Sequence, residues 1–281
     1  MILIADCGST KIDWCLLKEN KLVKQVFTGG INAVLLTREE IIQRLEAELV
    51  PELSAYAADI RCIHFYGAGC FPGEISENMA KALRTVLPAA REVEVNTDLL
   101  GAARALCGHQ PGVACILGTG SNSCYYDGQE IVDNVSPLGY ILGDEGSGAV
   151  LGKVLVGDVL KKQLPEDLCS AFLEQYGLDR MTIIRRVYKE PQPNRFLASL
   201  SPFLCKNMDR PEIRELVKEQ FCRFFRRNVA AYRCPELPVS FVGSIAAYYT
   251  PVLAEAAEET GFILGKVIQS PMEGLINFHT V

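Results

Sequence analysis

Residues 113–128, VACILGTGSNSCYYDG, consist of an apolar run, a glycine-rich turn and a second apolar run that ends at Asp-Gly. Two short apolar runs on either side of such a turn predict a β-hairpin. Residues 2–20, ILIADCGSTKIDWCLLKEN, repeat the pattern, and aligning Gly8-Ser9 with Gly120-Ser121 superimposes the two stretches at a constant offset of 112 residues. We therefore expect a fold of two similar halves, each opening with the same strand–turn–strand.

A third short strand follows each predicted hairpin, LVKQVF at 22–27 and EIVDN at 130–134, so each half opens with an antiparallel meander. Strands and helices then alternate. Thr37 and Glu40 form a capping-box pattern that predicts a helix start. The apolar run 60–69 predicts a buried strand. This alternation predicts an α/β fold with a largely parallel sheet behind each meander.

A polar Pro-Gly joint, HQPG at 109–112, precedes the second meander and is the expected domain boundary. We expect an N-terminal domain over residues 1–110 and a C-terminal domain over 111–281, with the last residues packing back on the N-terminal domain. The second half ends in a strand–turn–helix at 239–261, for which Gly261 is the C-terminal stop. Chains with two such halves commonly bind a ligand between them.

The composition excludes several classes of partner. A formal net charge of -6 without a basic block argues against nucleic acid. Eleven cysteines occur without a CxxC pair, which favours free thiols in a reducing cytoplasm over disulfides or zinc. The start, MILIADCG, does not resemble a signal peptide, and no apolar run approaches the roughly 20 residues that span a bilayer. We expect a cytoplasmic protein.

Glycine-rich hairpin turns direct backbone N–H groups into one concavity, which suits an anion such as phosphate. One such turn gives only weak support for phosphate binding, but two turns in corresponding positions predict a site for a nucleotide triphosphate. The usual nucleotide cradles are absent. GTGSNS at 118–123 lacks the third glycine of the dinucleotide fingerprint, and SGAVLGKV at 147–154 lacks the first glycine and the final Ser or Thr of a P-loop.

Three carboxylate positions fit the needs of phosphoryl transfer, which uses a metal ion and a group that deprotonates the attacking hydroxyl. Asp6 ends a predicted strand just before the first turn. Asp98 begins a predicted helix, where a purely structural role as the N-cap would also explain an aspartate. Asp144 and Glu145 lie in the glycine-dense stretch LGDEGSG, where a close ligand is expected.

The other notable side chains have structural explanations. His64 lies in an apolar run and is interpreted as a core histidine, whereas His109 and His279 have no partner at a suggestive spacing. Trp14 alternates with apolar residues and is expected in the core. A Ser-His-Asp hydrolase would require G-x-S-x-G on a strand-to-helix turn, which is absent.

Five motifs together resemble the N-acetylglucosamine kinase branch of the actin-like ATPase superfamily, which also includes the BadF/BadG-type ATPases. They extend over nearly the whole chain: ADCGSTK at 5–11, NTDLLGAA at 96–103, LGTGSN at 117–122, LGDEGSGAVLG at 142–152 and FVGSIA at 241–246. The resemblance implies two ribonuclease-H-like domains flanking a cleft. It also implies an ATP- and Mg²⁺-dependent kinase of an amino sugar, foremost N-acetylglucosamine at its 6-hydroxyl.

The resemblance also implies site residues. Asp98 would be the catalytic base, and Asp6 would hold Mg²⁺. Sugar-binding residues would be Asn32, Asp98, Asn122 and Asp144. Residues that bind ATP and its phosphates would be Gly8, Ser9, Thr10 and Lys11 in the first loop, Gly118, Thr119, Gly120 and Ser121 in the second, and Gly243 and Ser244 beside the adenosine.

Several alternatives stay open at this point. Glucosamine, N-acetylmuramate and anhydro-N-acetylmuramate are other acceptors of the same class. An ATPase activator that serves an iron-sulfur enzyme is an alternative of another class, although Cys124 falls inside a predicted strand. Related kinases often carry Trp in the sugar-side loop, where this chain has Tyr140. The oligomeric state, including a homodimer, is not fixed by these patterns.

Overall fold

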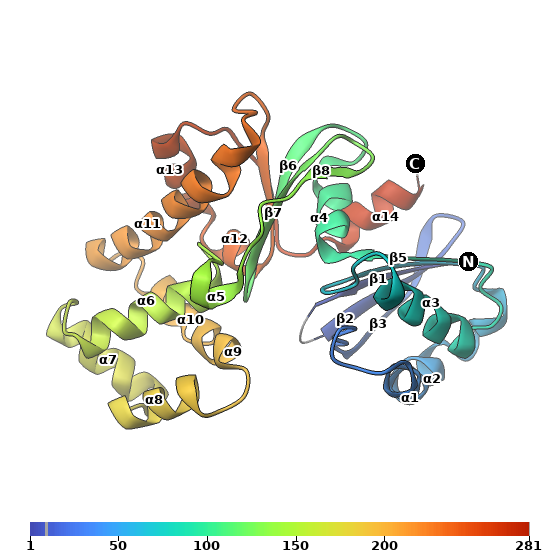
Figure 1. Cartoon of the computed structure of the whole chain (residues 1–281), viewed down its shortest axis with the longest axis horizontal. Helices are drawn as coiled ribbons and strands as arrows, with labels where there is room; N and C mark the ends of the chain where they lie inside the picture. The colour runs from blue at the N-terminus through green and yellow to red at the C-terminus, as the bar shows by residue number, and fades with distance from the viewer. Residues whose placement is uncertain (9–10, 281) are drawn as a thin grey trace. The chain divides into compact units, whose positions relative to one another are not determined.

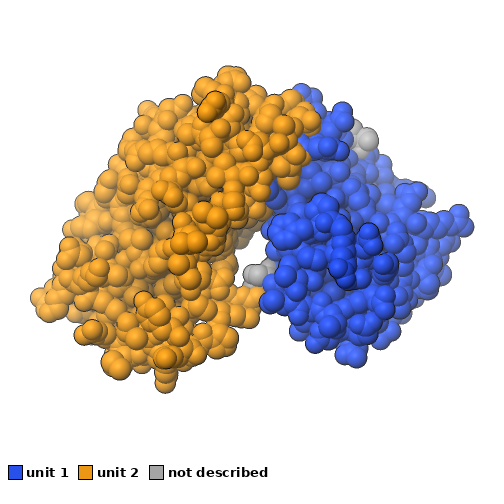
Figure 2. Space-filling model, in the orientation of Figure 1, with its two compact units in different colours: residues 1–110, 128–130, 271–281 blue, residues 111–127, 131–270 orange. Residues whose placement is uncertain are grey.

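The structure is a computed structural model that describes residues 1–8 and 11–280. The chain divides into two compact units, coloured separately in Figure 2. Unit 1 consists of Met1–Gln110, Gly128–Glu130 and Pro271–Val281, and unit 2 consists of Pro111–Asp127 and Ile131–Ser270. Each unit has its own sheet and its own hydrophobic core.

Within its described residues, unit 1 contains a five-stranded sheet in the order β3-β2-β1-β4-β5. The central strand β1 pairs antiparallel with β2 and parallel with β4. The predicted meander followed by parallel strands is confirmed. The strands are β1 (Ile2–Cys7), β2 (Lys11–Lys18), β3 (Lys21–Gly29), β4 (Cys62–Gly67) and β5 (Glu92–Thr97).

One face of this sheet packs on α1 (Arg38–Glu48) and α3 (Glu74–Val86), which Figure 1 shows beside the sheet, and α2 (Val50–Leu53) and η1 (Ala57–Asp59) connect them. Helix α1 begins with the predicted capping box of Thr37 and Glu40. Alternate residues of β1 and β4 face these helices, and Trp14 is fully buried among them, as predicted. In a strand, every second side chain points to the same face of the sheet.

The opposite face of the unit 1 sheet carries α4 (Asp98–Cys107) and α14 (Met272–Thr280). Helix α14 is the last element of the chain, yet it belongs to unit 1 and lies beside α4 (Figure 1). Gly274 makes this packing close, since a Cβ there would collide with the backbone of Ala105. The small residue therefore sets how near the two helices approach.

A polar cluster joins α14 to the sheet. The Nε2 atom of His279 lies 2.8 Å from the hydroxyl of Tyr66, and its ring stacks on His64 at 3.7 Å between centroids. The Nδ1 atom of His64 lies 2.8 Å from Glu94 Oε2, and Arg104 contacts both Tyr66 and Glu94. His279 therefore has partners that its sequence spacing does not indicate, and His64, interpreted from the sequence as a core histidine, is half-buried in this cluster.

Unit 2 repeats the topology, with the strand order β10-β9-β6-β7-β8 across its described residues. Strand β6 pairs antiparallel with β7 and parallel with β9, as β1 does with β2 and β4. The predicted α/β fold of two ribonuclease-H-like halves is confirmed. The strands are β6 (Gly112–Leu117), β7 (Ser121–Tyr126), β8 (Ile131–Asp133), β9 (Val239–Val242) and β10 (Leu264–Ile268).

Helices bury most of the unit 2 core, where Phe172, Phe203, Phe221 and Phe241 are fully or almost fully buried. Gly261 adopts the left-handed conformation and ends α13, as predicted. The helices are α5 (Gly139–Leu142), α6 (Gly148–Leu160), α7 (Glu166–Tyr176), α8 (Arg180–Tyr188), α9 (Pro193–Ala198), α10 (Ser201–Lys206), α11 (Pro211–Arg227), η2 (Val229–Tyr232), α12 (Ser244–Tyr248) and α13 (Thr250–Thr260).

The two hairpins correspond with a different alignment from the one that the glycines indicate. Cys7 ends β1 and Leu117 ends β6, so Asp6 corresponds to Ile116 rather than to Gly118. The glycine that corresponds to Gly8 is therefore Gly118 rather than Gly120. The turns also differ in length: four residues, 8–11, separate the last strand pair of the first hairpin, and three, 118–120, separate that of the second.

Candidate active site

One group of predicted site residues lies in unit 1, where β1 ends. Asp6 is directly opposite Asp13 on β2, so both carboxylates project from the same face of the sheet. Asp98 begins α4 on that face. The turn between β1 and β2 is closed by a hydrogen bond from Gly8 N to Lys11 O of 3.0 Å. The predicted Asp6, Gly8, Lys11 and Asp98 are therefore brought together in one unit.

The pKa of Asp6 is strongly perturbed at this position. Burial and, to a smaller extent, the negative charges of Asp98 and Asp13 together raise it to about 7, against an opposing effect of Lys11. No described side chain donates a hydrogen bond to Asp6. The sequence analysis missed Asp13, although its position across the hairpin from Asp6 follows from the strand register. A cation at this face would relieve the repulsion.

Asp98 differs from its expected N-cap role by one residue. The N-cap of α4 is Thr97, whose hydroxyl accepts a hydrogen bond from Leu100 N. Asp98 is the first helical residue, and its Oδ1 accepts from Leu99 N at 2.9 Å. Burial raises the pKa of Asp98, and the backbone N–H groups at the helix start oppose that rise. The cap is thus supplied by another residue, which leaves the second Asp98 oxygen for other partners.

The other predicted site residues of unit 1 are Lys11, Asn32, Ser9 and Thr10. The ammonium of Lys11 lies 4.9 Å from the centre of the Phe27 ring. Asn32 is exposed in the loop after β3, and its Oδ1 accepts a hydrogen bond from Val34 N at 3.1 Å. Ser9 and Thr10 lie outside the described residues.

A second group of predicted site residues lies in unit 2, in the turn between β6 and β7. The carbonyls of Gly118 and Thr119 accept hydrogen bonds from Gly148 N and Ala149 N at the start of α6. These two hydrogen bonds hold the carbonyl side of the turn against the start of α6. The amides of Thr119 and Gly120 donate to no acceptor among the described residues, so the turn offers free N–H groups of the kind that bind anions.

Asp144 contacts this same turn. Its Oδ1 accepts a hydrogen bond from Ser121 N at 3.3 Å, and its backbone has a φ of 54°, which is uncommon outside glycine. Burial raises the pKa of Asp144 to about 6. The structure therefore places the predicted sugar-binding carboxylate against the second phosphate loop.

Glu145, the next residue, anchors the Asp144 loop. Glu145 is buried, and its carboxylate accepts from Arg227 Nε at 2.5 Å and Asn228 Nδ2 at 3.3 Å, at the end of α11. A buried carboxylate with two such partners has its charge compensated. Glu145 therefore acts as a positioning residue, which distinguishes it from its neighbour.

The remaining predicted residues of unit 2 surround the same turn. Gly243 has a φ of 125°, and a Cβ there would collide with the carbonyl of Leu117. Ser244 follows at the start of α12 and is exposed. Asn122 is less available than expected, because its Oδ1 already accepts from Ser123 N and Asn134 Nδ2.

Comparison with known proteins identifies the family. No family model matches the chain, and no curated protein sequence matches it. Among solved structures, a proposed N-acetylglucosamine kinase from Porphyromonas gingivalis is 52% identical, with a TM-score of 0.97, over 100% of this chain and 99% of that one. This chain belongs to the N-acetylglucosamine kinase family of the actin-like ATPase superfamily.

Two more distant structures share the fold of the family. A proposed N-acetylglucosamine kinase from Chromobacterium violaceum is 19% identical, with a TM-score of 0.74, over 99% of this chain and 98% of that one. A ROK family glucokinase from Streptomyces griseus, in complex with glucose and AMPPNP, is 13% identical, with a TM-score of 0.55, over 99% of this chain and 97% of that one.

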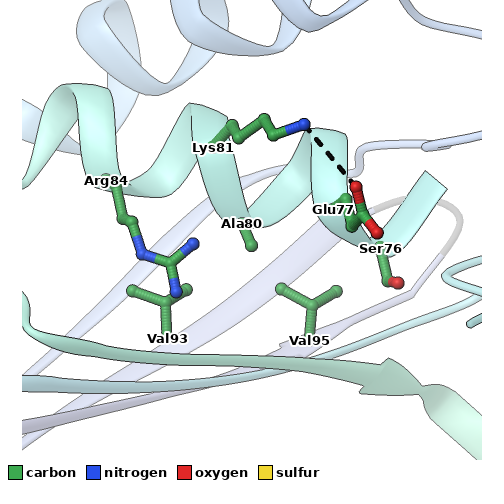
Figure 3. Close-up of a pocket in the computed structure, with 7 residues that line it drawn as sticks. All are labelled: Ser76, Glu77, Ala80, Lys81, Arg84, Val93 and Val95. Atoms are coloured by element: carbon green, nitrogen blue, oxygen red, sulfur yellow. Dashed lines mark ion pairs between the residues drawn. The ribbon is translucent and has the colours of Figure 1, made fainter. Parts of the chain in front are cut away.

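The carboxylate face of unit 1 is separate from the pocket shown in Figure 3. That pocket, of about 380 Å³, lies between α3 and β5, and Val93 and Val95 form its floor. Side chains alternate along β5, so these valines face α3, whereas Glu94 faces α4 and the carboxylates. Lys81 and Glu77 at its rim pair with each other at 3.6 Å.

No cluster of three or more His, Cys, Asp or Glu that could hold a metal ion occurs among the described residues. Magnesium in kinases is commonly held by one or two carboxylates together with substrate phosphates and water, so a complete protein cage is not needed. Asp6 fits that requirement, since no described side chain donates a hydrogen bond to it, whereas the facing Asp13 accepts hydrogen bonds from Gln25 Nε2 at both carboxylate oxygens.

Within the described ranges, no helix combines the length and the apolar character that crossing a membrane requires.

Proposed function

We propose that this chain is an ATP-dependent amino-sugar kinase that phosphorylates N-acetylglucosamine at its 6-hydroxyl. The observation that carries the proposal is the division of labour between corresponding hairpins: one presents carboxylates, the other presents free backbone amides. The 52% identity to a proposed N-acetylglucosamine kinase over the full chain supports the substrate. Glucosamine and the N-acetylmuramates are the competing acceptors.

Asp98 is the proposed general base. Its carboxylate takes the proton of the 6-hydroxyl while that oxygen forms a bond to the γ-phosphorus of ATP, and the bond between that phosphorus and the β,γ-bridging oxygen breaks to release ADP. Burial raises the pKa of Asp98, which makes its ionised form a better proton acceptor. The Leu99 N–H fixes one carboxylate oxygen and so orients the other.

Asp6 is the proposed magnesium residue, acting through water, with Asp13 beside it. Bound Mg²⁺ would supply charge neutralisation for the β- and γ-phosphates. The residues themselves present two oxygen donors from adjacent strands on a rigid sheet. The raised pKa of Asp6 supports this role, because a carboxylate in a repulsive environment gains most from a cation.

The remaining site residues are assigned by the same proposal. Ser9, Thr10 and Lys11 follow Gly8 in the proposed first phosphate loop, and the turn at 118–120, with its free amides, is the proposed second phosphate loop. Asn32, Asn122 and Asp144 bind sugar hydroxyls. Gly243 and Ser244 lie beside the adenosine; the close approach of Gly243 to Leu117 supports this assignment, because a larger residue would occupy that space.

A coupled ADP-release assay tests the proposal. Purified protein is given ATP with N-acetylglucosamine, glucosamine, N-acetylmuramate or glucose, each with Mg²⁺ and with excess EDTA. We expect Mg²⁺-dependent ADP release with the highest kcat/KM for N-acetylglucosamine, and a 6-phosphate product by NMR. ADP release that no sugar accelerates would contradict the kinase, and a preference for another amino sugar would change the substrate only.

The iron-sulfur activator receives no support from the cysteines, since Cys124 is buried within β7. All eleven cysteines are free thiols, which supports a reducing cytoplasm. We also propose a homodimer. Leu22 and Phe27 are 52% and 57% exposed on β3, the edge strand of unit 1, and exposed apolar edges favour association. Light scattering tests it, and a monomer at micromolar concentration would contradict it.

A further inference from the structure

Unit 2 contains a pocket that is separate from the carboxylate face and from the proposed phosphate loops. It has a volume of about 410 Å³ and lies among α5, α6, α8 and α9. Its walls are mainly apolar and include Val156 and Leu160 from α6 and Ile183 and Val187 from α8. Pockets of roughly 300–1,000 Å³ with apolar walls and few polar groups are typical small-molecule sites.

Large apolar side chains remain exposed where this pocket opens. Ile141 on α5 is 72% exposed, and Tyr188 on α8 is 74% exposed. Exposed apolar side chains that gather around a cavity mark a binding surface more often than isolated ones do. The pocket therefore provides apolar surface for a ligand both inside the cavity and at its opening.

Lys153 is the charged side chain that lines this pocket. Its ammonium donates a hydrogen bond to the carbonyl of Tyr140 at 2.5 Å. No carboxylate among the described residues forms an ion pair with it. Burial lowers the pKa of Lys153, Arg223 lowers it further, and Asp144 and Glu145 oppose this effect from a distance. An ammonium has three donors, so two remain for an anion.

The pocket wall continues into the loop that carries Asp144. Tyr140 belongs to α5, and Gly143 N donates to Gly139 O at 2.8 Å to close that helix. Asp144 N then donates to Pro137 O at 2.9 Å, and the Asp144 carboxylate contacts Ser121 N. A ligand that contacts Lys153 and α5 thus acts on a segment that ends two residues before Asp144, whose carboxylate contacts the turn between β6 and β7.

We propose that this pocket binds a small molecule with an apolar body and a single carboxylate or sulfonate, held by the Lys153 ammonium. We infer in addition that an occupied pocket restrains α5 and thereby positions Asp144. The binding site stands independently of the kinase activity, whereas the effect on Asp144 rests on the proposed function.

Gly157 provides a clean way to fill the pocket. It lies on α6 at the pocket wall, and a Cβ added there meets nothing within 4 Å. Gly157→Leu therefore places a side chain in open space, and leucine favours the helix more than glycine does. Lys153→Met removes the charge at similar length, and Lys161→Met at the end of the same helix is the matched control.

Binding is measured with 8-anilinonaphthalene-1-sulfonate, which combines an apolar body with one sulfonate. We expect saturable fluorescence that 4-phenylbutyrate displaces about tenfold better than the neutral 4-phenylbutan-1-ol, because a charge-assisted hydrogen bond is at stake. Gly157→Leu should abolish displaceable binding. Lys153→Met should weaken 4-phenylbutyrate about tenfold without affecting the alcohol, and Lys161→Met should change neither.

Two results would overturn the binding site. One is dye binding that Gly157→Leu leaves unchanged, and the other is equal displacement by the acid and the alcohol in the unmodified protein. Circular dichroism of each variant confirms that it is folded, so that loss of binding reports on the pocket.

The coupling to Asp144 is tested separately in the sugar kinase assay. Saturating 4-phenylbutyrate and the Gly157→Leu variant should each lower the KM for the sugar by about fivefold, the low end of allosteric coupling, with kcat unchanged. If the ligand binds and the KM for the sugar does not change, the coupling to Asp144 is excluded, whereas the proposed binding site is unaffected. Absence of any sugar-dependent activity would count against the proposed function alone.

Discussion

The two hairpins of this chain share a topology and differ in chemistry. In unit 1, Asp6 faces Asp13 across β1 and β2; in unit 2, the corresponding Ile116 faces Asn122 across β6 and β7. The first hairpin therefore concentrates negative charge, and the second offers neutral groups and the amides of a fixed turn. The same backbone topology thus supplies two kinds of surface, one suited to holding a cation and the other suited to binding an anion.

The largest effect should come from removing the proposed base beside the charged hairpin. Asp98→Asn should lower kcat by about 10²–10⁴-fold, because an amide cannot accept the hydroxyl proton. The KM for ATP should change little, since the phosphate loops are intact. Steady-state kinetics measure both values, and Asp59→Asn, in η1, is the control. Turnover within tenfold of the unmodified enzyme would exclude Asp98 as the base.

Asp6→Asn should change stability in a pH-dependent manner. The folded protein holds the Asp6 proton up to about pH 7, whereas the usual value is 3.8. Its stabilising contribution is therefore complete below about pH 4 and is lost as the pH rises through 7. In magnesium-free buffer, the variant should be more stable than the original at pH 8, by up to about 4 kcal/mol, and not at pH 4.

Urea unfolding at both pH values checks this prediction, with Asp13→Asn as a comparison on the facing strand. The unmodified protein should also gain more stability from Mg²⁺ with ATP than the Asp6→Asn variant does. Equal stability of the variant and the original protein at pH 8 would mean that the negative charges of unit 1 do not oppose one another as described.

Two neighbouring glycines of unit 2, Gly243 after β9 and Gly118 in the second hairpin, provide a matched pair. Gly243→Ala should destabilise the protein by about 2 kcal/mol, because the positive φ and the collision with Leu117 both oppose a Cβ. Gly118→Ala lies beside it, and a Cβ there meets nothing within 4 Å. Thermal unfolding should separate the two variants clearly. Equal melting temperatures would show that the turn tolerates displacement.

Asp144→Asn should have the smallest effect. The KM for the sugar should rise about fivefold, consistent with loss of one charge-assisted hydrogen bond of roughly 1 kcal/mol. The pKa of Asp144 is raised to about 6 by burial, so the charged form is lost below that pH. In the original enzyme the sugar KM should rise as the pH falls from 7 to 5, and the variant should not show that rise.

The strands of both meanders were predictable, because short alternating runs end at glycine turns that leave few options for the chain. The capping box at Thr37 and the stop at Gly261 were predictable for the same local reason. The N-cap of α4 was misassigned by one residue, since Thr97 and Asp98 are both good caps and only the structure distinguishes them.

Features that depend on distant parts of the chain were harder to predict. The alignment of the hairpins was shifted by two residues because Gly118 and Gly120 both match Gly8 in sequence, and only the strand ends distinguish them. Asp13 was overlooked, although strand register places it opposite Asp6. The partners of His279 lie more than 200 residues earlier in the chain, and no local pattern records such a contact.

Within the candidate site, the types of residue were easier to predict than their environments. Glycine density around Asp144 indicated a special backbone, and the structure shows a positive φ there. The sequence did not separate Asp144 from Glu145, because burial and the Arg227 partner become apparent only after folding.

The membership of α14 in unit 1 has a consequence for how the protein is made. A ribosome releases residues in order, so unit 2 can complete its core while unit 1 still lacks its last helix. Until residues 272–280 emerge, the Ala105 surface that receives Gly274 and the hydroxyl of Tyr66 that receives His279 stay uncovered. The first half of the chain to be synthesised is thus the last to be finished.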